Sequence, residues 1–258
     1  MDPTARFRRL VQGPEDDIPL DEAVLLIAAH AHPELDVDAR LAQLDGLAAG
    51  CPSPTVDGVV GHLFGTLGFR GNADDYGDPR NSFLDDVLDR RLGIPITLSV
   101  LLMEVGRRLG VPFEGVGLPG HFVVRHDDVL LDPFEGGRQL TDDDCAEHVH
   151  RIYGGAVAFE PSMLASVGPR AILARMLANL KQRFTMEGDA VDAEWVIRLR
   201  TLIPDIGERE LGDLAGAQAA IGRFRAAAET LEGWAEQLPE DDAAKAVARA
   251  RQLRARLN

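Results

Sequence analysis

The chain has 258 residues, of which 45% are hydrophobic and 27% charged, an ordinary globular composition that excludes a disordered or a fibrous protein. Its formal net charge of −15 argues against a nucleic-acid partner, and the basic amphipathic face that binds anionic membranes is missing. The N-terminus does not resemble a signal peptide, the apolar runs are too short to span a bilayer, and two cysteines make no disulfide framework. These features predict a cytoplasmic protein that uses no cofactor.

The pattern over residues 21–49 predicts two helices. Asp21 is placed to cap the first, which Pro33 ends. Asp36 is placed to cap the second, whose leucines recur on one face. A third, short helix is predicted over 59–69, although its glycines disfavour helix.

A polar loop over 71–80 is rich in turn residues, and Asn81 or Ser82 is then placed to cap a further helix. The loop imitates the start of a calcium-binding loop. It has Tyr76 and Phe83 at two positions where oxygen ligands are needed, which argues against calcium.

The next helix is predicted to begin at Pro95 and to end at Gly110. Its apolar residues lie nearly all round, so we expect it to be buried on most sides. Short β-branched runs with turn residues between them then predict strands near 113–117, 121–125 and 129–132.

The chain is predicted to be helical again from Met163 onwards. A weak internal repeat relates residues 193–206 to residues 228–241 and includes a proline in each copy, Pro204 and Pro239. Its spacing is close to the roughly 34 residues of a tetratricopeptide unit. The tail is therefore expected to be a helical-repeat region.

A histidine and an aspartate flank the strands of the predicted hairpin. If its loop consists of His126 and Asp127, then His121 faces Asp132 across the strands, with β-carbons roughly 4.5–5.5 Å apart. A carboxylate there would fix the imidazole tautomer and stabilise its cation. A three-residue loop would put the two on opposite faces, and a chance pairing or a structural hydrogen bond is the alternative interpretation.

The block NSFLDDVLDRRLGIPITLSVLLMEVGRRLGVPFEGVGLPGHFVVR at 81–125, followed by LLDPFEGGRQLT at 130–141, closely resembles the SirB-one family. That resemblance implies an α+β fold, with a transglutaminase-like (papain-like) core whose buried central helix lies on a small antiparallel sheet. An all-α, tetratricopeptide-like tail would follow. The implied domains are 1–165, with a helical N-terminal lead-in, and 166–258.

The resemblance also implies where a catalytic triad would lie. His121 falls on the transglutaminase histidine and Asp132 on its aspartate, whereas the position of the nucleophilic cysteine is occupied by Pro95. A small shift in alignment would offer Thr97 or Ser99 instead, and a hydroxyl needs far more activation than a thiol. The resemblance therefore implies the fold more strongly than the activity.

The other candidate ligands and nucleophiles give weaker signals. Neither Cys51 nor Cys145 stands at the start of the central helix, so neither is expected to be the nucleophile. Cys145 with two nearby histidines, His148 and His150, lacks a fourth zinc ligand, and a solvated helix face explains them better. The histidine His32 is interpreted as a favourable placement near a helix C-terminus.

Three functions follow from these patterns. The first is a catalytically silent transglutaminase-like scaffold that binds a protein or peptide. The second is a hydrolase or acyltransferase in which His121 acts as base, Asp132 orients it and the helix amides near Pro95 bind an oxyanion. The third and least favoured is a redox or metal role through Cys51 or Cys145.

Overall fold

The computed structural model describes residues 2–204 and 206–257, apart from the side chain of residue 208. The chain contains two compact units: one consists of Glu15–Met176, and the other combines the first 14 residues with Leu177–Asn258. The division between them falls within the long helix α8 (Pro169–Glu187). The domains 1–165 and 166–258 stay a prediction, because compactness alone does not define a functional domain.

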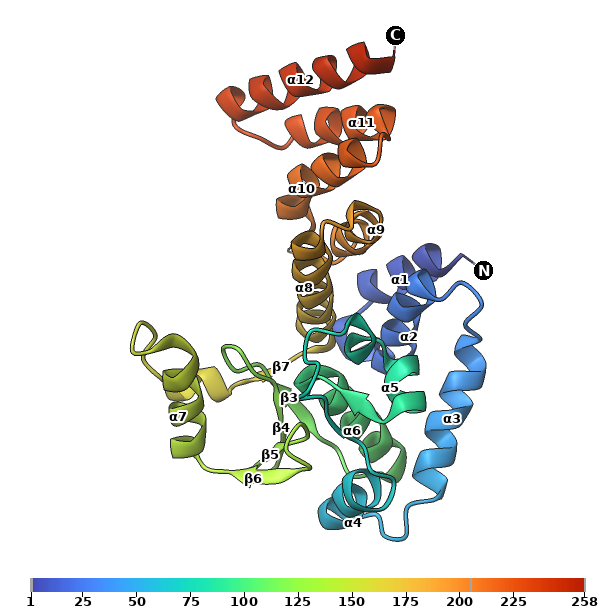
Figure 1. Ribbon diagram of the computed structural model, residues 1–258, viewed down its shortest axis with the longest axis vertical. Coiled ribbons are helices and arrows are strands. Elements are labelled where there is room, and N and C mark those ends of the chain that lie inside the picture. Colours follow the sequence, from blue (N-terminus) through green and yellow to red (C-terminus); the bar gives the residue numbers. More distant parts are fainter. Residues whose placement is uncertain (1, 205, 258) are drawn as a thin grey trace. The chain divides into compact units, whose positions relative to one another are not determined.

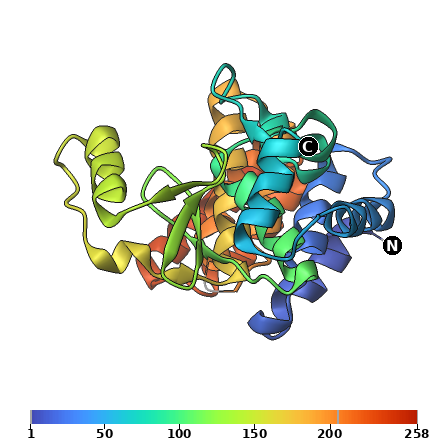
Figure 2. The same cartoon turned by 90° about the horizontal axis from the view of Figure 1, so that it is seen from below.

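The unit Glu15–Met176 is built around one buried helix, α6 (Pro95–Leu109), which contacts both the sheet and the other helices. The sheet and α7 lie on one side of α6, and α2 and α3 lie on the other (Figures 1 and 2). The surrounding helices are α2 (Leu20–Ala31), α3 (Val37–Ala49), α4 (Val56–Val60), α5 (Leu84–Arg90) and α7 (Asp142–Tyr153).

The sheet has five strands in the order β6-β5-β4-β3-β7, and every neighbouring pair is antiparallel. A separate parallel pair joins β1 (Arg70–Gly71) to β2 (Leu92–Gly93) just before α6. The five strands are β3 (Glu114–Val116), β4 (Val123–His126), β5 (Val129–Asp132), β6 (Arg138–Leu140) and β7 (Ser166–Val167). This mixture of helices and antiparallel sheet agrees with the predicted α+β class.

The other unit is helical throughout the residues that are described. The ring of Phe184 in α8 packs edge-on against Trp195 of α9, and successive helices from α9 to α12 contact one another. Its helices, besides the end of α8, are α1 (Pro3–Gln12), α9 (Ala190–Arg200), α10 (Gly207–Ala220), α11 (Phe224–Ala235) and α12 (Glu240–Arg254). The repeated segments 193–206 and 228–241 thus begin within α9 and α11.

Local signals placed α6 and α3 correctly. Pro95 is the first residue of α6, where its missing N–H costs nothing, and Gly110 ends the helix with a positive φ of 71°. The side chain of Asp36 accepts a hydrogen bond from the Ala39 N–H at 3.0 Å, so it caps α3 as predicted.

Two expectations for the N-terminal region need correction, one in its capping residue and one in its bounds and helix type. The N-cap of α2 is Pro19, and Asp21 lies inside the first turn, where its buried carboxylate pairs with Arg108 at 2.6 Å. The expected helix over 59–69 is instead the short α4 followed by a π-helical turn over Gly61–Thr66.

The predicted caps of α5 were also wrong, because the side chain of Asn81 forms tertiary hydrogen bonds instead of capping the helix. Asn81 is fully buried in a 3-10 turn (Pro79–Ser82), and α5 begins only after Phe83. The Asn81 amide donates to the carbonyl of Asp75 at 2.7 Å and accepts from Asn72 at 3.0 Å. It therefore fixes the loop that precedes it, not the helix that follows.

No helix in the described ranges is long and apolar enough to cross a membrane.

Candidate functional site

The hairpin that carries His121 and Asp132 has a different turn from the one predicted. The residues of the turn are Asp127 and Asp128, with φ of 49° at Asp127, and His126 pairs with Val129. This register places Asp132 opposite Val123, so His121 is its diagonal neighbour. The slip amounts to two residues in the pairing, and side chains alternate with a period of two, so both side chains still share one face.

The structure brings the two predicted site residues into contact. The Nε2 atom of His121 lies 2.8 Å from Oδ2 of Asp132, and both residues are buried. The other carboxylate oxygen accepts hydrogen bonds from the backbone N–H groups of Phe134 at 2.9 Å and Glu135 at 3.4 Å. The Asp132 carboxylate is therefore held from both sides and can orient the imidazole.

The protonation pattern of the pair follows from hydrogen-bond chemistry. An ionised Asp132 only accepts, so Nε2 of His121 carries the donated hydrogen, and a neutral ring leaves its lone pair on Nδ1. Among the residues that are described, no hydrogen bond to Nδ1 is found. That nitrogen is the atom that could act as a base.

Two aromatic rings border the imidazole of His121. The Phe134 ring meets it edge-on, with centroids 6.3 Å apart, and the His148 ring of α7 lies tilted by 38° against it, with centroids 4.4 Å apart. Burial and the neighbouring His121 lower the pKa of His148, and its Nδ1 accepts from Arg151 at 2.9 Å. His148 is therefore a neutral neighbour of the dyad, and its Nε2–H is buried with no acceptor found in the described part of the chain.

Sequence reasoning considered His148 only as a weak zinc ligand. Within the described residues, Cys145, His148 and His150 do not come together as a set of metal ligands. The interpretation of these residues as a helix face stands for His150, which is exposed, but His148 packs on the dyad. Its helical position gave no signal for this, because only the packing of α7 decides it.

Arg175 of α8 fixes the backbone that presents His121. Its Nη2 donates to the carbonyls of Leu118 and His121, each at 2.7 Å, and its guanidinium lies over the Phe122 ring. Gly120 precedes His121 with a φ of 72°, a conformation that favours glycine. Sequence reasoning missed Arg175, which lies 54 positions away from His121.

Contacts through Phe134 connect the dyad to the start of α6. Gly71 pairs with Gly93, two residues before Pro95, and the Gly71 N–H donates to the carbonyl of Phe134 at 3.3 Å. The Phe134 ring occupies the space that a side chain at Gly71 would need, only 2.6 Å from a β-carbon built there. The glycine thus allows this ring to lie between the strand pair and His121.

The alternative nucleophile positions on α6 are sealed from solvent. Thr97 and Ser99 are each 0% exposed, and neither hydroxyl has a hydrogen-bond partner within the described ranges. Activation of either hydroxyl would require a base in contact with it. Neither is presented for catalysis in this conformation.

The two cysteines, Cys51 and Cys145, both lie away from the start of α6 in the sequence. Cys51 donates from its sulfur to the carbonyl of Ser53 at 3.2 Å, and Cys145 is fully buried in a small apolar core beneath α7. Burial, followed by the nearby carboxylates of α7, raises the pKa of Cys145 to about 11. In the part of the chain that is described, neither sulfur hydrogen-bonds to an imidazole. Cys145 is therefore an inert structural thiol.

Comparison with known proteins agrees with this architecture. Residues 27–178 match the model of the transglutaminase-like superfamily. The chain belongs to this superfamily. It is 35% identical over 237 residues to a UPF0162 protein of Xylella fastidiosa strain 9a5c, covering 81% of this chain and 84% of the relative. It therefore also belongs to the UPF0162 family.

Two further relatives show how far the similarity extends. A UPF0162 protein of Pseudomonas aeruginosa is 36% identical over 197 residues, which are 70% of this chain and 72% of that protein. Mouse F-box only protein 21 is 34% identical over 152 residues, but these make up 53% of this chain and only 23% of the mouse protein. No solved structure gives a significant match.

Proposed function

We propose that this UPF0162 protein is a catalytically silent transglutaminase-like scaffold that binds a protein or peptide. The observation that carries the proposal is Pro95 at the first position of α6. The resemblance to the SirB-one family puts the nucleophilic cysteine there, and a proline ring has no nucleophilic atom. The burial of Thr97 and Ser99 supports the same conclusion, since neither hydroxyl offers a substitute.

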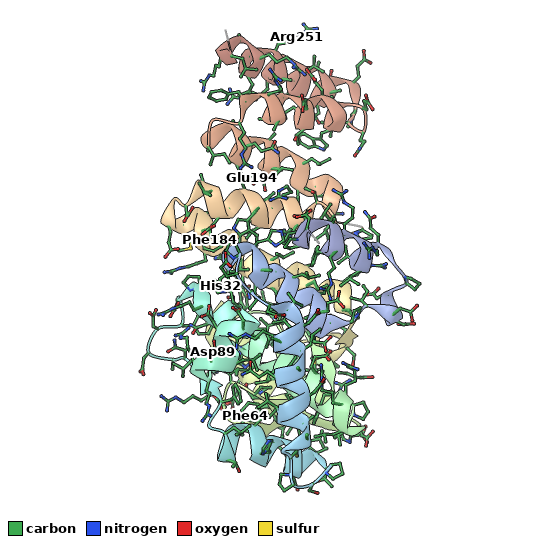
Figure 3. The ribbon with its side chains drawn as sticks, turned by 90° about the vertical axis from the view of Figure 1, so that its right-hand side faces the viewer. His32, Phe64, Asp89, Phe184, Glu194 and Arg251 are labelled. Atoms are coloured by element: carbon green, nitrogen blue, oxygen red, sulfur yellow. The ribbon has the colours of Figure 1, made fainter. Side chains whose placement is uncertain are left out.

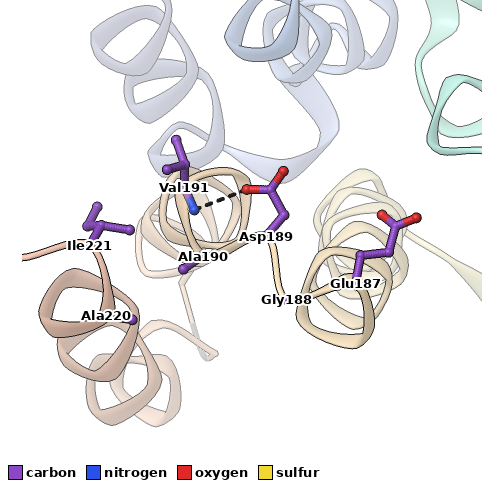
Figure 4. A pocket seen from close by; sticks show the side chains of 7 residues that line it. All are labelled: Glu187, Gly188, Asp189, Ala190, Val191, Ala220 and Ile221. Atoms are coloured by element: carbon purple, nitrogen blue, oxygen red, sulfur yellow. Dashed lines mark hydrogen bonds between the residues drawn. The ribbon is translucent and has the colours of Figure 1, made fainter.

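The helical unit supports the binding role. Figure 4 shows a pocket at the turn between α8 and α9, where the Asp189 carboxylate accepts from the Val191 N–H at 3.2 Å. A neighbouring pocket between α8, α9 and α10 is lined by Phe184, Ile197 and small residues of α10. Stacked helical pairs of this kind present surfaces that suit peptides. A tetratricopeptide-like character of this unit is part of the proposal.

The test measures turnover and binding in the same protein. Purified full-length chain should show no thiol-dependent transamidation or proteolysis of generic glutamine and peptide substrates. Affinity capture from extract of the native cell should retain a specific partner. His121→Ala is compared with His126→Ala, a strand histidine whose Nδ1 contacts the Pro112 carbonyl. The proposal of a catalytically silent scaffold would be refuted by robust turnover that is lost in His121→Ala and retained in His126→Ala.

The second candidate is a hydrolase or acyltransferase that uses the dyad without a protein thiol. The observation that favours it is the oriented His121 imidazole, whose Nδ1 is left for a water or a substrate hydroxyl. His121 would take the proton of that nucleophile, and Asp132 would stabilise the imidazolium. This candidate predicts hydrolysis of an activated ester that is insensitive to thiol alkylation and lost in His121→Ala.

A further inference from the structure

A second histidine–carboxylate cluster lies where α2 contacts α5. His32 follows the last turn of α2 (Figure 3), and Asp85 and Asp86 lie in the first turn of α5. The Nδ1 atom of His32 is 2.6 Å from Oδ2 of Asp85, and its Nε2 is 3.5 Å from Oδ2 of Asp86. In the described ranges this is the one group of three potential ligands whose donor atoms all lie within 4.8 Å of one another.

Both carboxylates have unsatisfied oxygens. Asp85 is 5% exposed, and its Oδ1 is inaccessible and has no hydrogen-bond partner among the described residues. The same holds for Oδ2 of Asp86, the oxygen that faces the imidazole. A buried carboxylate oxygen without a donor is costly, so each such oxygen needs an explanation.

The nearby arginines do not supply the missing donors. Arg40 makes two hydrogen bonds to Asp89, at 2.6 and 2.7 Å, and Arg90 pairs with Asp78 at 2.9 Å. These guanidiniums act on the cluster only from a distance. The single imidazole of His32 therefore faces two carboxylates, and the cluster keeps a net negative charge even if the ring is protonated.

The tautomer of His32 adds a repulsive contact to the unpaired oxygens. Nδ1 must donate to the Asp85 carboxylate, so a neutral ring turns the lone pair of Nε2 towards Oδ2 of Asp86. Two acceptor atoms facing each other at 3.5 Å repel unless a cation lies between them. That cation is either a proton or a metal ion.

We propose that His32, Asp85 and Asp86 form a binding site for a divalent transition-metal ion of the zinc class. With bonds of roughly 2.0–2.1 Å, two ligand atoms on a tetrahedral zinc are about 3.3 Å apart. The distance of 3.5 Å between Nε2 of His32 and Oδ2 of Asp86 is close to that value. Asp85 then acts as the carboxylate that orients a metal-bound histidine through its other nitrogen. Imidazole favours zinc, nickel or cobalt over magnesium and calcium.

The side chains of His32 and Asp86 are 35% and 19% exposed, so the cluster borders solvent. With Nε2 and one Asp86 oxygen as direct protein ligands, water would complete the coordination. The site should thus bind a metal reversibly and hold α2 to α5 when it is loaded. A bound metal would stabilise the contact between α2 and α5. This proposal holds whether or not the His121 dyad is catalytically active.

The test titrates zinc into full-length protein that has been dialysed against a chelator, using calorimetry and competition with a chromogenic zinc indicator. We expect one saturable site per chain. Asp86→Asn and His32→Gln should each weaken binding by more than tenfold, and Asp85→Asn by roughly 10–100-fold as the loss of an orienting partner. The matched control is Asp89→Asn, which removes the same charge from the same helix and should leave the zinc affinity unchanged.

Cobalt gives a second readout that does not depend on affinity alone. Loading with cobalt should produce visible ligand-field bands that are lost in His32→Gln and retained in Asp89→Asn, with circular dichroism showing that both variants are folded. Absence of a saturable zinc site in the wild type would refute the proposal. Equal affinity in the wild type and in His32→Gln would refute it too, because the metal would then bind elsewhere and a proton would be the shared cation.

Discussion

The unit Glu15–Met176 contains two histidine–carboxylate arrangements that differ in how their oxygens are satisfied. Both oxygens of Asp132 have donors: the His121 ring on one side and two backbone N–H groups on the other. In the cluster of His32, Asp85 and Asp86, each carboxylate keeps an oxygen without a donor in the described structure. The carboxylate oxygens of the first arrangement are all paired, whereas the second leaves an oxygen of Asp86 facing the His32 ring, where we propose that a cation binds.

The largest expected difference between the two is in stability. Asp132→Ala removes one side-chain partner and leaves two backbone donors unpaired, so the free energy of unfolding should fall by about 3 kcal/mol. Asp85→Ala, in the presence of chelator, loses one hydrogen bond and should cost about 1 kcal/mol. Urea unfolding measures both. The exposed turn residue Asp128 provides the control, since Asp128→Ala should stay within about 0.5 kcal/mol of wild type. Equal losses for Asp132→Ala and Asp85→Ala would contradict the distinction.

Pro95→Cys tests whether the first arrangement lacks only a nucleophile. A thiol at the start of α6, with the His121 dyad available, should have a pKa about one unit or more below the usual 8.5. The rate of alkylation at this site against pH, followed by mass spectrometry, measures that pKa.

The native thiols and the dyad provide the controls for Pro95→Cys. Cys145, whose pKa is about 11, should react far more slowly than the new cysteine. His121→Ala in the same background should raise the pKa of the new thiol. If the pKa is ordinary and indifferent to His121, then Pro95 does not occupy the nucleophile position.

The smallest effect concerns pH and the second arrangement. Burial and the adjacent Asp85 raise the pKa of Asp86 above its ordinary 3.8. The folded chain then holds this proton more tightly than the unfolded chain. Its stabilising contribution is present at low pH and is lost as pH rises above about 4 through the raised folded pKa. In the presence of chelator, the free energy of unfolding of Asp86→Asn should therefore increase relative to wild type as pH rises. Urea unfolding at a series of pH values measures this difference.

Asp89 should show the opposite dependence. The hydrogen bonds from Arg40 lower its pKa, so its contribution is present above its ordinary pKa and is lost as pH falls. Asp89→Asn should consequently lose stability relative to wild type as pH rises. Parallel trends in the two variants would show that the neighbouring carboxylates do not differ in environment.

Much of the first arrangement could be predicted because it depends on local rules. The hairpin needs a short turn, and strand alternation then puts His121 and Asp132 on one face for any two-residue turn. The identity of the turn was missed because Asp127 adopts a positive φ, which aspartate tolerates better than most residues. His148 and Arg175 were missed because each lies on a helix, and only the packing of that helix brings the residue to His121.

The second arrangement was not predicted at all. His32 was interpreted only as a cation near a helix end, and Asp85 and Asp86 were not assigned to any site. The pair His32–Asp85 spans 53 positions in the sequence, and neither residue stands in a spacing that signals metal binding. Their meeting depends on the contact between α2 and α5, which no local pattern encodes.

The sequence by itself determined where α6 begins and ends, which residue caps α3 and which face of the hairpin holds the dyad, because neighbouring residues and strand alternation decide such features. Only the tertiary structure decided that Asp21 pairs with Arg108, that Asn81 fixes a loop and that His32 meets two carboxylates. A buried polar group takes its partner from whatever element packs against it, and that element can lie anywhere along the chain.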